Sequence, residues 1–225
     1  MNTAPRHHLD PATLLSYAAG ALSPDLAVVV DTHLAGCAHC RAALARAEAV
    51  GGALLEQQQP AAAQTGRAAA LREAMRQRLA QAPAPAPAPA ASAPASNDPD
   101  LLPAPLRPYF GPRYSGLKWR WMGPGLRYLR TEGPAGGTLL MLRIAPGRKL
   151  PVHGHHGSEI TQILRGAYHD ALGHFGPGDI ADLDAETQHQ PVTCPGEDCI
   201  CVAALDAPLR YPGRIARLLQ PLLRI

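Results

Sequence analysis

The sequence predicts a multi-domain chain of α plus β class, with a small helical module followed by an all-β module. Apolar residues recur at helical spacing before residue 83, and short apolar runs alternate with glycine and proline after residue 100. A proline–alanine tract lies between these two regions. The chain has 225 residues, of which 46% are hydrophobic, which is enough for two modest cores. We therefore expect domains at residues 1–82 and 101–225, joined by a linker at residues 83–100.

The first two predicted helices carry capping signals. Asp10 is a favourable N-cap that is followed by Pro11, and Gly20 is a natural stop for this helix. Ser23 stands in front of Pro24 and predicts the start of a second helix in the same way. We expect this second helix to run to about residue 36.

Two further helices are predicted before the linker. The third helix begins at about residue 37 and continues through residue 54. The fourth covers residues 67–81, where Leu71, Met75 and Leu79 are spaced i, i+4, i+8 and share one face. From spacing alone, such a face is expected to pack on the neighbouring helices.

The linker is predicted from its proline content. The stretch from Pro83 to Ala95 reads PAPAPAPAASAPA. Alternate prolines remove backbone donors and clash with the preceding turn, so this stretch cannot be a helix. We expect a semi-rigid, polyproline-like spacer and hence a domain boundary.

The sequence pattern of the region after the linker is typical of a β protein. Short apolar runs occur at residues 138–144, 160–164 and 200–204, and glycine and proline recur between them. Short strands separated by turn residues at this density are typical of sandwiches and barrels.

The helical region contains a metal-binding pattern, HxxxCxxC. His33 and Cys37 are four residues apart, which is one helical turn, and Cys40 lies one turn further on. Two thiolates and an imidazole are typical zinc ligands, and tetrahedral zinc needs a fourth. His8 is our preferred candidate because of its place at the start of the first helix, and His7 is its rival.

Other readings of this pattern are weaker. A CxxC pair alone is also a redox motif, and His39 is predicted to point away from the ligand face. The combination of HxxxCxxC with an upstream histidine at a junction of helices favours zinc. Short helices have little core of their own, so zinc would contribute much of their stability.

The β region contains a second metal-binding pattern. Gly147, His153, His155, Glu159 and Gly166 fall at the defined positions of the first cupin motif, and the resemblance implies a cupin β-barrel, or jelly roll. His153 and His155 are two apart on a predicted strand, so both face one side of it.

A later histidine completes this set. His189 follows the segment 176–179, GPGD, which resembles the second cupin motif, although Ala171 stands where that motif opens with glycine. Three imidazoles and a carboxylate suit Zn, Fe, Mn, Ni or Cu, so the second site is predicted as zinc or another divalent metal.

Cysteines near the C-terminal end of the β region are candidate redox sensors. Cys199 and Cys201 are two apart on an apolar run, and Cys194 precedes them. Thiolates near a metal are readily oxidised. The alternative interpretation is that both are small buried apolar residues, and we weigh the two equally.

Charge and hydropathy exclude several classes of protein. The net charge is only +3, with 7 basic and 6 acidic residues in 1–82 and 14 basic and 10 acidic in 101–225. Neither region has the dense basic footprint of a nucleic-acid binder. No apolar run approaches the roughly 18 residues of a membrane span, and no signal peptide is visible. We expect a cytoplasmic protein.

The motifs together resemble the ChrR family of anti-sigma factors, in which a zinc-binding anti-sigma domain precedes a cupin domain. The resemblance implies zinc at both sites, a 1:1 complex with an extracytoplasmic-function-type sigma factor, and release of that factor in response to singlet oxygen or organic peroxide. By the same resemblance, the fourth helix contributes sigma-factor contacts and the cupin domain is required for the response. The ligand sets it implies are His8, His33, Cys37 and Cys40 in the first site and His153, His155, Glu159 and His189 in the second.

Two rival functions remain at this stage. A cupin metalloenzyme of the dioxygenase type with a regulatory zinc module is the alternative, although no general base is evident beyond Glu159. A DNA-binding regulator is disfavoured by the weak charge. For the anti-sigma factor, we expect the signal to cross the linker through altered domain docking or proteolysis, because a flexible linker transmits little strain.

Overall fold

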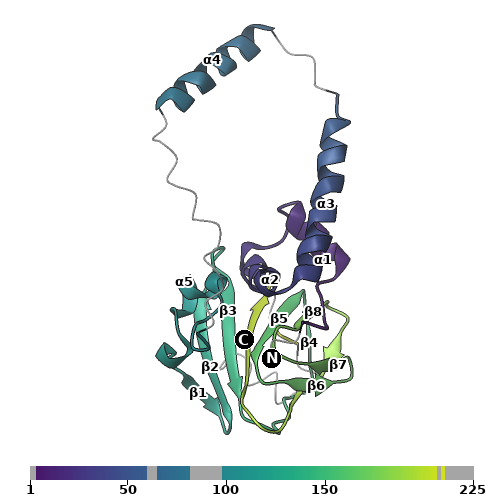
Figure 1. Ribbon diagram of the computed structural model, residues 1–225, viewed down its shortest axis with the longest axis vertical. Helices are drawn as coiled ribbons and strands as arrows, with labels where there is room; N and C mark the ends of the chain where they lie inside the picture. Colours follow the sequence, from purple (N-terminus) through teal and green to yellow (C-terminus); the bar gives the residue numbers. More distant parts are fainter. Residues whose placement is uncertain (1–3, 60–64, 82–97, 207–208, 211–225) are drawn as a thin grey trace. The chain divides into compact units, whose positions relative to one another are not determined.

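The structure, a computed structural model, describes residues 4–59, 65–81, 98–206 and 209–210 (Figure 1). The predicted linker tract from Pro83 to Ala95 lies outside these residues. Within them, no helix combines the length and the apolar character that a membrane span requires.

The first two helices begin where the capping signals predicted. The helices before the predicted linker are α1 (Pro11–Ala18), α2 (Pro24–Gly36), α3 (Ala38–Glu56) and α4 (Thr65–Gln81). The Asp10 carboxylate accepts a hydrogen bond from the backbone N–H of Ala12 at 2.7 Å, and the Ser23 hydroxyl accepts one from Asp25. The predicted N-caps are therefore confirmed, and both helices have proline at their first position.

The strands fall where the apolar runs predicted, with additional short strands between them. The bounds are β1 (Arg120–Gly123), β2 (Leu126–Glu132), β3 (Thr138–Ile144), β4 (His153–His155), β5 (Glu159–Arg165), β6 (Tyr168–Asp170), β7 (Gly173–Phe175), β8 (Ile180–Leu183), β9 (Gln188–His189), β10 (Val192–Thr193), β11 (Cys199–Leu205) and β12 (Leu209–Arg210). Three short helical turns precede them: η1 (Ala104–Leu106), α5 (Arg107–Phe110) and η2 (Tyr114–Gly116).

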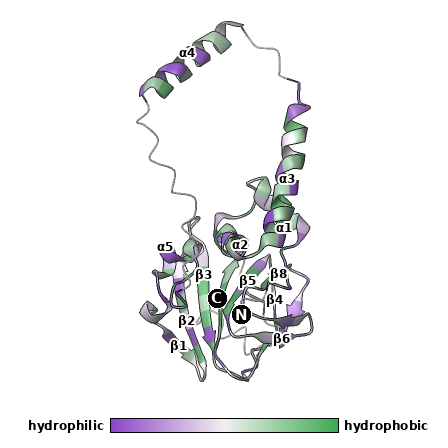
Figure 2. Ribbon diagram, in the orientation of Figure 1, coloured by the Kyte–Doolittle hydropathy of each residue, from purple (hydrophilic) through white to green (hydrophobic). Residues whose placement is uncertain are grey.

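The strands form three antiparallel sheets. The largest has the order β1-β2-β3-β11-β5-β8, and the smaller two are β10-β6-β7 and β12-β4-β9. The predicted cupin class is confirmed in its sheet-rich architecture. Among the described residues, however, the ladders do not join into one continuous closed barrel. The apolar run of β3 can be followed in green in Figure 2.

Helices α1 and α2 and the first part of α3 belong to the same compact unit as the sheets. One unit comprises Met1–Gly51 together with Asp100–Ile225, and the other comprises Gly52–Pro99. In the first unit α2 packs on β5, β11 and η1, and a single apolar core contains residues of helix and sheet, such as Val29, Met141 and Val202. The helices up to residue 51 therefore share the core of the sheets. The predicted division into domains at residues 1–82 and 101–225 stays a prediction.

Helix α2 and helix α4 differ strongly in burial. Most of α2 is buried, including Leu26, Val29 and Val30. In α4, which lies in the other compact unit, Leu71, Met75 and Leu79 are 60%, 66% and 68% exposed. The predicted apolar stripe is therefore present on α4 and exposed to solvent.

Candidate metal centres

The first candidate centre forms at the junction of α2 and α3. His33 lies in the last turn of α2 and Cys40 in the first turn of α3, while Cys37 caps α2 in an extended conformation (φ −105°, ψ 104°). Helix α2 therefore ends at Gly36 and α3 begins at Ala38, so Cys37 lies at the junction of the two helices, as predicted. The break turns the chain so that the Cys37 and Cys40 thiols lie side by side. His8 approaches from the stretch before α1.

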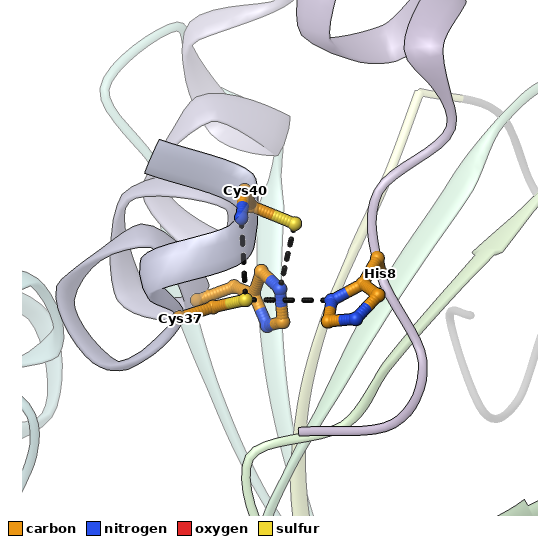
Figure 3. Close-up of side chains that lie close together, drawn as sticks. His8, Cys37 and Cys40 are labelled. Atoms are coloured by element: carbon orange, nitrogen blue, oxygen red, sulfur yellow. Dashed lines mark hydrogen bonds between the residues drawn. The ribbon is translucent and has the colours of Figure 1, made fainter. Parts of the chain in front are cut away.

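The distances between these side chains fit a tetrahedral metal ion. His33 Nε2 lies 3.3 Å from Cys40 Sγ, and Cys37 Sγ lies 3.4 Å from His8 Nδ1 (Figure 3). The ligand atoms of all four residues lie within 4.8 Å of one another. A zinc ion with bonds of about 2.0–2.3 Å spaces its four ligands by roughly 3.3–3.8 Å. Two thiols and two imidazoles at these separations form a closed set typical of structural zinc.

Burial favours the neutral forms of two of these groups, His33 and Cys40. It lowers the pKa of His33 to about 4, so this imidazole is neutral near pH 7 and can donate a lone pair. Burial also raises the pKa of Cys40 to about 11. Metal binding must therefore release a proton from this thiol. The backbone N–H of Cys40 lies 3.4 Å from Cys37 Sγ, where it stabilises a thiolate.

The two other histidines of this region lie outside the ligand group. His7 stacks on Phe175 with ring centroids 4.0 Å apart, and its Nε2 lies 3.0 Å from the carbonyl of His174. His39 is exposed and stacks on His8. The geometry therefore favours His8 over His7 as the fourth ligand.

The second candidate centre lies on the strands. His153 is the first residue of β4 and pairs in register with His189 of β9, and Glu159 is the first residue of β5. All three are buried, and their ligand atoms lie within 4.8 Å of one another. Of His155, the last residue of β4, only the backbone is described, so its role as a ligand stays a prediction.

Hydrogen bonds fix the tautomers of both imidazoles in this centre. His153 Nδ1 lies 2.9 Å from the carbonyl of Pro151, and His189 Nδ1 lies 2.9 Å from the carboxylate of Asp170. Because each acceptor requires a proton on Nδ1, both Nε2 atoms carry lone pairs, and they face each other at 3.0 Å. A cation between them removes the repulsion of the lone pairs, so the residues fit a metal ion.

Sequence reasoning missed Asp170. Its side chain is 0% exposed and that of His189 is 4% exposed, and the pair lies between β6 and β9. The only sequence signal was indirect, since Asp170 stands directly before Ala171, where the second cupin motif departs from its usual glycine. A carboxylate behind a metal-binding histidine orients the ring and raises its basicity.

Comparison with known proteins assigns the family. Residues 14–41 match the family described as "Putative zinc-finger", and residues 113–207 match the ChrR cupin-like domain. The chain is 43% identical over 222 residues to the anti-sigma-E factor ChrR of Cereibacter sphaeroides, covering 98% of this chain and 99% of the relative. The chain belongs to the ChrR family of anti-sigma factors. This confirms the family that the motifs indicated.

A solved structure agrees with this assignment. The crystal structure of Rhodobacter sphaeroides SigE in complex with the anti-sigma ChrR matches with a TM-score of 0.69 and 37% identity, covering 90% of this chain and 100% of that chain. The zinc-finger match and the group of His8, His33, Cys37 and Cys40 together support zinc binding. As a member of the ChrR family this chain is a regulatory protein and not an enzyme, and the dioxygenase alternative is dropped.

The cysteines of β11 are buried in this ChrR-family fold. Cys199 and Cys201 lie in a core cluster with Ile163 and Phe175. Burial raises the pKa of Cys199 to about 12 and that of Cys201 well above its ordinary value, to which the charge of Glu159 also contributes. Both are therefore neutral thiols, and Cys201 is close enough to Glu159 of the second centre to feel its charge. Their role in redox sensing stays a prediction.

Proposed function

We propose that this chain is a zinc-dependent anti-sigma factor that binds an extracytoplasmic-function-type sigma factor in a 1:1 complex and negatively regulates transcription. The observation that supports this most directly is the identity of 43% over nearly the whole length of a ChrR anti-sigma-E factor, together with the match to a ChrR bound to SigE.

The sigma factor binds, in this proposal, to the helical region. Helix α4 has no buried residue among those described, and its stripe of Leu71, Met75 and Leu79 is exposed. An apolar stripe on an isolated helix gains stability when a partner covers it. The first zinc centre holds α2 and α3 in the arrangement that the partner recognises.

The cupin domain senses oxidative stress, in this proposal singlet oxygen or organic peroxide, and its response releases the sigma factor. Support comes from the buried group of His153, Glu159 and His189 and from the buried thiols of β11, of which Cys201 feels the charge of Glu159. A metal bound there would supply a reactive centre that an oxidant or an oxidised product can alter. We place the protein in the cytoplasm, where sigma factors act.

Co-purification tests the proposal. The full chain should pull down the sigma factor that we expect to be encoded beside it, and should repress a reporter promoter that depends on that factor. Substituting His153 and His155 with alanine should leave binding intact and blunt the response to singlet oxygen. A full chain that neither binds the sigma factor nor represses its promoter contradicts the proposed function. Loss of binding in the His153 and His155 variant contradicts the proposed division of labour.

A further inference from the structure

The stretch that carries His8 is held by acidic side chains of the sheet. Asp179 Oδ1 accepts hydrogen bonds from the backbone N–H groups of Arg6 at 2.5 Å and His7 at 3.0 Å. Asp182 accepts one from the N–H of Asp10 at 3.0 Å. The backbone is therefore fixed on both sides of His8, and Asp179 is buried with 4% of its surface exposed.

The same turn of the sheet also touches His33. The carbonyl oxygen of Gly178 lies 3.0 Å from His33 Nδ1, and His33 is fully buried. A carbonyl can only accept, so Nδ1 carries the proton and the Nε2 lone pair faces Cys40. One turn of the sheet thus supports both imidazoles of the first centre.

The turn has a demanding backbone of its own. Gly178 has a φ of +91°, which favours glycine, and a Cβ there would also make a tight contact with Pro5 Cγ at 3.2 Å. The second oxygen of Asp179 accepts from the N–H of Gly176 at 2.8 Å, which closes the turn. Asp179 therefore divides its two oxygens between its own turn and the stretch before His8.

The turn is also connected to the second centre through two paired strands. The N–H of Gly178 donates to Ile163 of β5 at 2.8 Å, and β8 starts directly after Asp179. At the far end of this pair, Leu183 of β8 lies opposite Glu159 of β5, a residue of the second centre. A displacement of Glu159 can therefore be transmitted to the turn through the single strand pair β5–β8.

From these contacts we propose that Asp179 and the Gly178 carbonyl are positioning groups of the first metal centre, through which the cupin domain sets the zinc affinity of the helical region. The inference rests on the assignment of the first centre as a zinc site within the proposed function. In this proposal the signal does not pass through the linker, because the sheet contacts His33 and the stretch before His8 directly. A change at the second centre would then weaken the contacts of Asp179 and the Gly178 carbonyl with His33 and the stretch before His8. The first centre would bind zinc less tightly, and the helical surface that the sigma factor binds would be less well ordered.

The experiment measures metal affinity at the first centre in the full chain, with no sigma factor present. Cobalt(II) reports on this centre selectively, because its thiolate charge-transfer band needs cysteine ligands, and competition with zinc then gives the zinc affinity. We expect Asp179→Ala to weaken zinc binding by about 10- to 100-fold, the usual effect of losing an outer partner of a ligand. Asp179→Asn should recover part of this loss, because the amide oxygen still accepts from the stretch before His8.

Asp184→Ala is the matched control. Asp184 also closes a turn next to β8, but it is exposed and its hydrogen bonds go to Glu186 and Thr187 of that same turn. It should leave the cobalt band and the zinc affinity unchanged.

Three outcomes overturn the inference. An unchanged affinity in Asp179→Ala does so directly. Equal losses at both metal centres, or a general loss of fold that Asp179→Asn does not rescue, show that Asp179 serves only the stability of the sheet. Because the readout is metal affinity, failure here leaves the anti-sigma activity to be judged by co-purification alone.

Discussion

The two candidate metal centres differ in what holds their ligands. In the second centre His153 and His189 face each other across a strand pair, and Glu159 opens a strand paired on both sides, so backbone ladders position the side chains. In the first centre Cys37 lies between two helices and His8 lies outside any helix or strand. Ligands on paired strands are held in place by the backbone hydrogen bonds of the sheet. The ligands of the first centre depend on the metal itself and on the contacts that the sheet makes with His33 and the stretch around His8.

This difference predicts unequal consequences of metal loss. Without metal, the second centre keeps its strands, and the tautomers of its histidines stay fixed by Pro151 and Asp170. The first centre loses the bonds that join the His8 stretch to the α2–α3 junction. The centre that we propose to sense oxidants thus lies on paired strands, and the centre that we propose to organise the helices lies where the backbone has less support.

The largest expected effect comes from removing the thiols of the first centre. Substituting both Cys37 and Cys40 with serine should abolish zinc binding there, and structural zinc of this type is worth about 10 kcal/mol or more. The α2–α3 junction should loosen and sigma-factor binding should be lost, as measured by zinc content, limited proteolysis and co-purification. Cys194→Ser is the control. Full sigma-factor binding by the zinc-free double variant contradicts a structural role for this centre.

The next effect tests how much support the helices take from the sheet. The buried Asp25 carboxylate accepts from the N–H groups of Ala135 and Gly137, each at 3.0 Å. Asp25→Ala removes two charge-assisted hydrogen bonds and should lower the free energy of unfolding by about 3–5 kcal/mol. Denaturant unfolding of the full chain measures this change, with Glu56→Ala on the exposed end of α3 as the control.

A glycine variant provides an independent check of the same contact. A Cβ on Gly133 would lie 2.1 Å from Asp25 Oδ1, so Gly133→Ala should destabilise the chain through the same carboxylate. If both Asp25→Ala and Gly133→Ala unfold at the denaturant concentration of the parent chain, the helices do not depend on this contact.

These contacts show what sequence reasoning could and could not reach. Helix starts, strand runs and the HxxxCxxC spacing are local properties, and they were predicted. Asp25 and Gly137 are 112 residues apart, and His7 and Asp179 are 172 apart. No periodicity reports such pairs, so the docking of the helices on the sheet, and with it a path that avoids the linker, could not be predicted.

A smaller effect is expected at the second centre from Asp170. Asp170→Asn keeps a hydrogen-bond acceptor for His189 but removes the negative charge behind the imidazole. We expect metal affinity at this centre to fall by about 10- to 100-fold, while the cobalt–thiolate band of the first centre stays unchanged. Metal content after dialysis against a chelator measures the change. Equal losses at both centres contradict the assignment of Asp170 to the second.

The smallest effect concerns the reactivity of the cysteine thiols, which should differ between the first centre and strand β11. In the metal-loaded chain a maleimide should label Cys194 first, because Cys199 and Cys201 are buried and burial raises the pKa of both thiols. Labelling of Cys199 should increase with pH as the thiolate forms, towards its pKa of about 12. A chelator should expose Cys37 and Cys40 to the reagent, since only the first centre depends on metal for its arrangement. Mass spectrometry of peptides locates each label.

If Cys199 and Cys201 are labelled as fast as Cys37 and Cys40 after chelation, the strands around the second centre open as readily as the helix junction, and the proposed contrast in rigidity is wrong.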